Sequence, residues 1–321
     1  MPQPRSRIYD MVIDDLQELK SLKITTLADN SAYASGFVGQ WGLSFLVEAE
    51  DSRSRIHKIV FDTGAIKESL LYNIKKLKID LSNLEYIVLS HGHSDHTAAT
   101  VELLKMAKRE VRVVVHPHVF LPKFTVGKHG KRVEGGPPKG QRLGDIQNAG
   151  GQLVQSMKPF ELFPGAYTTG EIPRVTDFES ISPPVSDATA KRFTVVEGKT
   201  VPDLLLDDQG LLMSVKRLGP VVITGCSHAG VVNTLLHAQN ILRSKNIYGA
   251  VGGFHLVQRD GSYIQKTVRQ LRKFGLQLVS PCHCTGFKAS CVLYQVFPEA
   301  FVLNFNGRTM KVGRKPKPQI V

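Results

Sequence analysis

The sequence predicts a layered α/β protein, and three observations support this prediction. Short apolar runs rich in valine and isoleucine alternate with longer segments in which apolar residues recur at helical spacing. The run at 56–61 is followed by a helical pattern and then by a second run at 86–89, as in a strand–helix–strand unit. The same order returns between residues 220 and 280. At 321 residues the chain can bury a large core.

The first part of the chain is expected to form strands separated by two helices. The strands combine β-branched residues with short polar boundaries. They are expected at 23–28, 42–48, 56–61, 86–89 and 111–115. The helices are expected over 66–77 and 97–109, where apolar residues repeat every three or four positions.

Residues 121–201 differ in composition from the chain on either side. Glycine and proline interrupt every periodic run, as in Gly135-Gly136-Pro137-Pro138, so this interval is expected to be dominated by loops. Long irregular insertions in compact folds typically serve as lids or substrate walls. We therefore expect a single domain over 1–321, with an irregular, basic, lid-like insertion at about 121–201 and a basic C-terminal tail at 311–321.

Regular pattern returns after the insertion. Strands are expected at 211–215, 220–224, 247–251 and 277–280. Helices are expected at 231–242 and across 264–271, with Gly275 as a terminator of the second. Each of the last three strands runs into a loop that contains histidine.

Charge and cysteine usage limit the partners and the compartment. Lysine and arginine outnumber acidic residues by 41 to 28, which gives a net charge of +13 and favours an anionic partner, either a small molecule or nucleic acid. The first 23 residues contain charged residues and no long apolar run, so we expect neither a signal peptide nor a membrane partner. Four cysteines fit a reducing compartment. A cytoplasmic protein is expected.

The stretch from Ser90 to Thr97 contains three histidines and one aspartate directly after an expected strand. His91 and His93 are two residues apart on extended backbone and should point to the same side. Asp95 and His96 fall where the chain turns into a helix and should point elsewhere. This pattern predicts two neighbouring metals, while the alternative is a polar surface loop that is rich in histidine.

Loops from several strand ends should meet at one edge of the sheets, which is the usual position of an active site in a layered α/β protein. The candidate ligands divide into His91, His93 and His228 for one metal, and Asp95, His96 and His283 for the other. Cys226 is a candidate bridge or supporting group, and His255 a further ligand or proton donor. Asp62 is expected behind the metals, orienting a ligand imidazole.

This mixture of nitrogen, oxygen and sulfur donors indicates two divalent cations. Zinc is the first choice, with iron, manganese and cobalt as alternatives. His116 and His118 follow another strand and are expected at the rim or in support of the ligands. Arg174 can form a planar fork on a phosphate or carboxylate, or it can pair with Glu171 or Asp177 at the surface.

These motifs resemble the signature of the metallo-β-lactamase superfamily. The resemblance is carried by Asp62-Thr63-Gly64 and by the stretch Ser90 to His96. More narrowly, the chain resembles the branch that contains dihydropterin ribofuranosylaminobenzene phosphate synthases and uncharacterised metal-dependent hydrolases. The narrower likeness lies at Thr169 to Arg174, Thr224 to His228, Gly252 to Leu256 and His283 to Gly286. It extends from about residue 25 to 307 and implies an αββα sandwich of two mixed sheets flanked by helices.

The chain departs from the superfamily pattern at two points. Cys226 occupies the strand end where most members place a bridging aspartate. The usual extra histidine upstream is absent, because no histidine lies between His129 and His228. The resemblance therefore implies that His228 takes over this ligand role.

The expected function is a binuclear metal-dependent hydrolase that attacks phosphate-bearing or ester-type small molecules with metal-bound hydroxide. Asp95 would share the water, His255 would protonate the leaving group, and Arg174 would hold an anionic tail. The first alternative is a synthase that activates a pterin diphosphate on the same metals. A metal-dependent nuclease and a non-catalytic binding protein are further alternatives.

Overall fold

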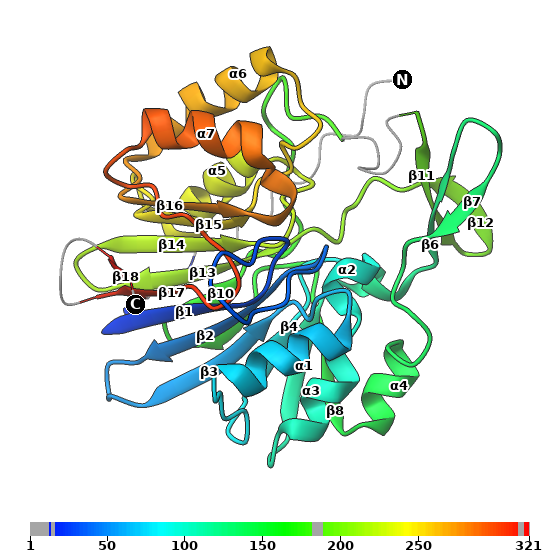
Figure 1. Cartoon of the computed structure of the whole chain (residues 1–321), viewed down its shortest axis with the longest axis horizontal. Helices are drawn as coiled ribbons and strands as arrows, with labels where there is room; N and C mark the ends of the chain where they lie inside the picture. The colour runs from blue at the N-terminus through cyan, green and yellow to red at the C-terminus, as the bar shows by residue number, and fades with distance from the viewer. Residues whose placement is uncertain (1–12, 14–16, 182–188, 314–317, 321) are drawn as a thin grey trace.

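Two β-sheets packed face to face form the centre of the molecule, and helices cover both outer faces (Figure 1). The structure is a computed structural model that describes residues 13, 17–181, 189–313 and 318–320. The arrangement is the predicted αββα sandwich, so the fold class is confirmed. No helix within these ranges is long and apolar enough to cross a lipid bilayer.

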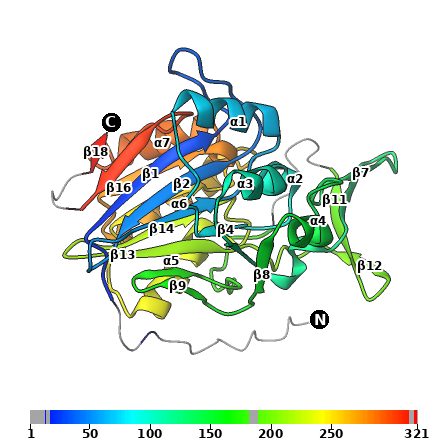
Figure 2. The same ribbon diagram turned by 90° about the horizontal axis from the view of Figure 1, so that it is seen from below.

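The first sheet contains the strands from the beginning of the chain together with its C-terminal strands. Its order is β18-β17-β1-β2-β3-β4-β5-β8, and β3, β4, β5 and β8 run parallel. Figure 2 shows β1, β2, β4 and β8 of this sheet. The bounds are β1 (Ser21–Ala28), β2 (Ser44–Glu50), β3 (Ile56–Phe61), β4 (Tyr86–Val88), β5 (Val111–Val115), β8 (Gly151–Gln155), β17 (Thr309–Val312) and β18 (Gln319–Ile320).

The second sheet has the order β16-β15-β14-β13-β10-β9, with β14, β15 and β16 parallel. The bounds are β9 (Glu161–Phe163), β10 (Ala166–Thr168), β13 (Gly210–Val215), β14 (Gly219–Thr224), β15 (Gly249–Gly253) and β16 (Leu278–Cys282). Glycines in β15 allow close approach to neighbouring backbone, because a Cβ at Gly252 would lie 2.1 Å from the Thr224 carbonyl oxygen.

Helices pack on the outer face of each sheet through separate apolar clusters. Those beside the first sheet are α1 (Lys67–Lys76), α3 (Thr100–Met106) and α4 (Leu143–Asn148), and those on the second are α5 (Val231–Leu242), α6 (Gly261–Leu271) and α7 (Phe287–Val296). The short helical segments are α2 (Ser94–Thr97), η1 (Pro117–Phe120), η2 (Arg272–Phe274) and η3 (His283–Thr285).

The helix expected over 97–109 is shorter than predicted: α3 covers Thr100–Met106, and α2, at Ser94–Thr97, is a separate turn before it. The break has a local cause, because the backbone of α2 is bonded to the loop after β3. The N–H of Thr63 donates to the carbonyl of His96 at 2.8 Å, and the N–H of Ala98 donates to the carbonyl of Gly64 at 3.0 Å. These hydrogen bonds interrupt the helix between α2 and α3 and fix the orientation of α2.

The interval at 121–201 contains more regular structure than expected, although loops still make up over half of its described residues. The described part of this interval contains α4, β8, β9 and β10, which belong to the main layers, and most of a separate four-stranded sheet. We call this the small sheet; its strands are β6 (Lys123–Val126), β7 (Arg132–Glu134), β11 (Lys191–Val196) and β12 (Lys199–Pro202). Three of the four strands are too short to show periodicity, and glycine and proline mark the turns between them.

The basic tail at 311–321 is also more ordered than a frayed end. Lys311 and Val312 belong to β17, which pairs with β1, and β18 pairs in turn with β17. The basic residues at 314–317 lie outside the described residues. The described part of the tail therefore extends the first sheet through β17 and β18.

The main core lies between the two sheets. Phe45, Ile59 and Phe61 from the first sheet are fully buried, together with Met213 and Ile223 from the second. Phe45 and Phe61 are direct neighbours on adjacent antiparallel strands. This contact layer keeps the sheets in register, so it also determines how the strand ends of the two sheets face each other.

We expect the substitution Phe61→Ala to lower the free energy of unfolding by about 3–5 kcal/mol, because it leaves a cavity between the sheets. The matched control is Ile56→Ala on the same strand, where 49% of the side chain's surface is exposed and the change should stay within about 0.5 kcal/mol. Urea unfolding followed by circular dichroism measures both. Similar losses in the two variants would contradict this description of the core.

Candidate metal centre

The predicted site residues gather where parallel strands of both sheets end. They follow β3 (Asp62), β4 (His91, His93, and Asp95 and His96 in α2), β14 (Cys226, His228), β15 (His255) and β16 (His283). Three of these residues, Asp62, His255 and His283, have φ between 49° and 60°, as does Ser227, which lies between Cys226 and His228. Such left-handed backbone is costly for residues other than glycine, and it marks sharp turns that aim the side chains inward.

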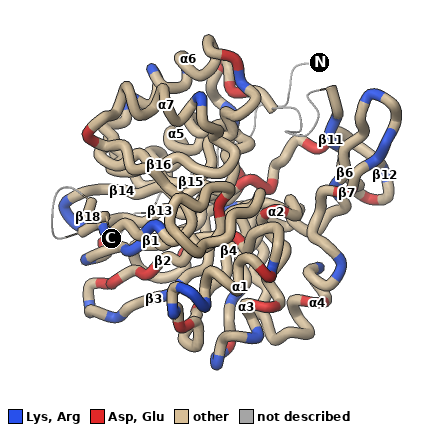
Figure 3. The backbone as a smooth tube through the Cα atoms, in the orientation of Figure 1, with Lys and Arg blue, Asp and Glu red and all other residues tan. Residues whose placement is uncertain are grey.

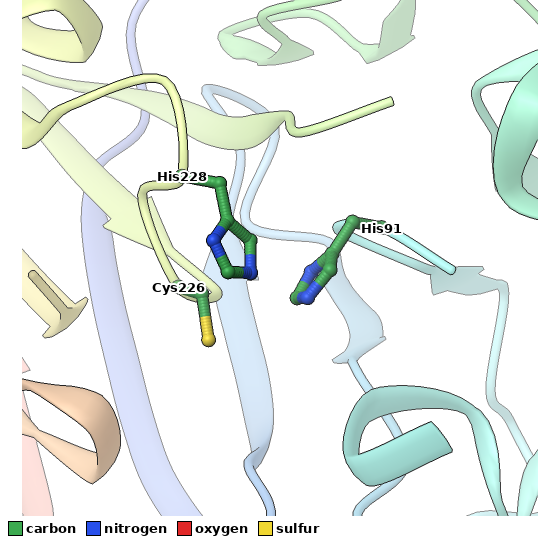
Figure 4. A group of neighbouring side chains, drawn as sticks. All are labelled: His91, Cys226 and His228. Atoms are coloured by element: carbon green, nitrogen blue, oxygen red, sulfur yellow. The ribbon is translucent and has the colours of Figure 1, made fainter. Parts of the chain in front are cut away.

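The first predicted ligand set comes together. The Nδ1 atom of His93 lies 2.9 Å from Nε2 of His91 and 3.2 Å from Nε2 of His228. Figure 4 shows the rings of His91 and His228 directed toward the same space, with the sulfur of Cys226 beside them. Three nitrogens from two different sheets therefore face one another.

The second predicted set lies directly beside the first. The Asp95 carboxylate lies 3.8 Å from Nε2 of His96 and 3.5 Å from Nε2 of His283. Cys226 Sγ lies 3.2 Å from Nε2 of His96. Potential ligand atoms of His91, Cys226 and His228 lie within 4.8 Å of one another, as do those of His96, Cys226 and His283. Cys226 is thus common to both groups.

Burial keeps most of these imidazoles neutral. It lowers the pKa of His93 to about 3, and burial together with neighbouring histidines lowers the pKa of His91 and His228 well below 6.5. For His96, burial is outweighed by Asp62 and Asp95, which raise its pKa to about 9. For Asp95, burial is outweighed by His96 and His283, which lower its pKa below the usual range.

These residues fit divalent cations. Neutral imidazoles present lone pairs to a common space, and the buried Nε2 of His283 and Nδ1 of His228 have no hydrogen-bond partner among the described residues. Asp62 and Asp95 stabilise a positive charge at His96. A bound cation would supply this charge in place of the proton. Imidazole, carboxylate and thiolate are together the donors that zinc accepts.

Asp62 occupies the supporting position that the sequence predicted. Its Oδ2 lies 2.6 Å from Nδ1 of His96, and its Oδ1 accepts the Ser90 N–H at 2.7 Å. The Ser90 hydroxyl donates to Asp62 at 2.7 Å and lies 2.9 Å from Nδ1 of His91. Because Nδ1 of both histidines faces these acceptors, Nε2 of each is left for the centre.

The loop after β1 supports His283, which the sequence analysis did not foresee. Asp29 accepts the backbone N–H of His283 at 2.8 Å, and the side-chain oxygen of Asn30 lies 3.0 Å from Nδ1 of His283. Asp29 and Asn30 end an expected strand at the same edge. Their position at that edge was the signal that could have identified them.

A buried ion cluster connects the small sheet to the metal-binding loop. Lys123, at the start of β6, lies 3.0 Å from Asp203 and 3.1 Å from Asp207, and all three side chains are buried. The other oxygen of Asp207 accepts the N–H of Gly92 at 2.8 Å, between His91 and His93. No sequence pattern indicated this cluster, because its members are far apart in the chain.

Arg174, predicted to bind substrate, lies behind His228. Its Nη2 donates to the carbonyl oxygens of Leu204 at 2.8 Å and His228 at 3.4 Å. In this position it supports the loop that carries His228, and its role on a substrate stays a prediction. The rings of His116 and His118 pack against each other, with centroids 4.9 Å apart, and neither residue belongs to the two ligand groups described above.

Arg192 on β11 was not singled out from the sequence. It is partly buried, and its positive charge contributes to the low pKa of His93 and His228. The small sheet therefore brings a cationic side chain toward the centre.

We expect Asp62→Asn to weaken cation binding by about 10- to 100-fold, because an amide cannot hold His96 and Ser90 as the carboxylate does. Competition with a chromophoric chelator measures the affinity. Asp80→Asn, an exposed carboxylate outside the centre, is the control and should bind like the wild type. Equal affinities for all three proteins would contradict the role given to Asp62.

Comparisons with known proteins identify the family of this chain. Residues 53–239 match the sequence profile of the Metallo-beta-lactamase superfamily. A 7,8-dihydropterin-6-methyl-4-(beta-D-ribofuranosyl)-aminobenzene-5'-phosphate synthase from Methanocaldococcus jannaschii is 33% identical over 298 residues, covering 92% of this chain and 99% of that protein. An uncharacterized protein from the same organism is 29% identical over 274 residues, covering 85% of this chain and 94% of that protein.

A solved structure is similar over almost the whole chain. It is described as a metal-dependent hydrolase of the beta-lactamase superfamily, and it is 27% identical in sequence with a TM-score of 0.74. The likeness covers 91% of this chain and 99% of that structure. On its profile match, its 33% identical relative and its fold, the chain belongs to the metallo-β-lactamase superfamily.

Proposed function

We propose that this chain is an enzyme that uses two divalent cations, zinc first, to cleave a phosphate-bearing or ester-type bond in an anionic small molecule. The observation that carries the proposal is the pair of ligand groups that share Cys226 and are built from loops of both sheets. Buried polar side chains normally have hydrogen-bond partners, and here several imidazole nitrogens have none among the described residues. A cation-binding role explains this exception.

When bound, two divalent cations would polarise the reacting bond and make water acidic enough to attack near neutral pH. The chain's own residues then have distinct roles. The neutral His91, His93 and His228 offer lone pairs as ligands. Asp95 stays ionised and retains 20% side-chain exposure, so its carboxylate can accept a hydrogen bond from the nucleophilic water and orient it. His255 has two ring nitrogens without partners and can deliver a proton to a leaving group.

An anionic substrate suits the electrostatics of the chain. The net charge of +13 attracts anions, and lysine and arginine gather at the outer ends of the small sheet (Figure 3). We assign the contact with the anionic group to Arg192, because β11 places its charge close enough to affect the metal-site histidines. Arg174 is assigned to support His228.

The test is a screen of zinc-loaded protein against phosphomonoesters, phosphodiesters, lactones and a dihydropterin diphosphate. His93→Ala should reduce turnover to background and lower bound zinc, because it removes a nitrogen that faces two other ligands. His129→Ala, outside the centre, is the control. Unchanged activity in the His93 variant, or less than one bound ion per chain in the wild type, would contradict the proposal. RNA or DNA binding that weakens steeply with salt would favour the nuclease alternative.

A synthase is the second candidate, and two observations favour it. The relative named as a synthase is similar over 92% of this chain. The indole of Trp41 is 44% exposed and packs beside His283, with ring centroids 5.1 Å apart. This places a flat apolar surface at the rim of the centre, where a pterin ring could stack. A synthase releases diphosphate only when its aromatic acceptor is present, whereas a hydrolase needs only water.

We expect Trp41→Ala to raise the KM for a dihydropterin diphosphate roughly ten-fold, from the ~1–3 kcal/mol that aromatic stacking contributes. Diphosphate release, measured with and without acceptor, gives the KM and separates the two reactions. Tyr294→Ala on α7 is the matched control, since this ring is exposed and packs on Phe301 away from the ligand groups. An unchanged KM in the Trp41 variant would remove this support for the synthase.

A further inference from the structure

A third group of potential ligands lies beside the two described above and shares Cys226 with both. It consists of Cys226, His255 and Cys284, whose ligand atoms all lie within 4.8 Å of one another. All three side chains are buried. Cys284 and His255 belong to neither of the two predicted ligand sets. The group differs chemically from the other two because it contains two sulfurs.

His255 is aimed into this group without a hydrogen-bond partner. Only 8% of its surface is exposed, and neither ring nitrogen has a partner in the described part of the chain. The residue has φ of 49° at the end of β15, and the N–H of the preceding Phe254 is held by the Thr285 hydroxyl at 3.0 Å. The protein thus fixes a costly backbone conformation that leaves a buried imidazole unsatisfied.

The backbone makes room for the thiol of Cys284. A Cβ on Gly253 would lie 2.7 Å from Cys284 Sγ and 3.4 Å from the Cα of Cys226. Cys284 Sγ itself lies 3.6 Å from the carbonyl oxygen of Cys226. Gly253 therefore permits the thiol to pack against the loop that carries Cys226.

We propose that Cys226, His255 and Cys284 together bind a thiophilic divalent cation, such as zinc or cadmium, at a sulfur-rich position next to the predicted metal pair. Two thiolates and one imidazole fill three positions of a tetrahedral ion and leave the fourth open. The cation is bound by the thiolate forms of both cysteines, whose two negative charges balance its charge. Sulfur donors select soft cations over magnesium or calcium. As a ligand of this cation, His255 cannot also be the proton donor of the proposed reaction, so this inference replaces that one role and leaves the other residue roles of the proposed function unchanged.

The experiment uses cobalt(II) as a spectroscopic probe in a His91→Ala/His96→Ala double variant of the full chain. This variant lacks one histidine from each of the other two groups and keeps the third group complete. We expect the double variant to bind cobalt and to show the charge-transfer absorption that two cobalt–sulfur bonds produce. Adding Cys284→Ser should remove at least half of that absorption and weaken binding ten-fold or more. Adding Cys291→Ser, an exposed cysteine on α7, should change neither.

A second measurement keeps the test valid if the double variant does not fold. In the otherwise unchanged chain, His255→Gln and Cys284→Ser should each alter the cobalt–sulfur absorption, whereas Cys291→Ser should not. The inference is overturned if Cys284→Ser leaves the absorption and affinity unchanged, or if the purified protein has Cys226 and Cys284 joined in a disulfide. Because the readout is spectroscopic, it stands apart from the substrate screen that tests the proposed function.

Discussion

The structure depends on how closely the two sheets approach at Gly225. A Cβ on this residue would lie 2.0 Å from the hydroxyl of Ser90 and 2.9 Å from the carboxylate of Asp62, so no side chain fits there. Gly225 belongs to the loop after β14, and Ser90 and Asp62 belong to loops of the opposite sheet. This contact brings Cys226 within 3.2 Å of His96. Without it, the donors of the two sheets would form two incomplete half-sites.

The close approach of the sheets also has a free-energy cost, because it buries charged and polar side chains. Burying carboxylates, thiols and imidazoles removes them from water, and the cost is recovered only when each group finds a partner. Asp62 has its partners in Ser90 and His96, while His255 and His283 retain nitrogens that are not satisfied within the described residues. Cation binding would satisfy these groups in the folded state alone, so affinity for metal and stability of the fold are linked.

The sequence was most informative where chemistry and periodicity coincide. The bounds of β3 and β5 match the prediction because each strand is a short apolar run with polar ends, and the histidine loops were found because parallel strands end at one edge. The small sheet was missed because three of its four strands have only three or four residues, and because its pairing of β6 with β11 joins segments far apart in the chain. Asn30, Lys123 and Asp207 were missed because their roles depend on contacts between distant segments.

The hydrogen bond from the Gly92 N–H to Asp207 connects the loop of candidate metal ligands to the small sheet, because Asp207 also pairs with Lys123 on β6. Lys123 and Asp203 complete this connection within a buried, nearly water-free space. The small sheet and the loop that carries His91 and His93 are therefore connected through buried charges. A chimaera that exchanges the small sheet between relatives must therefore transfer Lys123 together with Asp203 and Asp207. If they are separated, an unpaired charge is left buried beside the loop that carries His91 and His93.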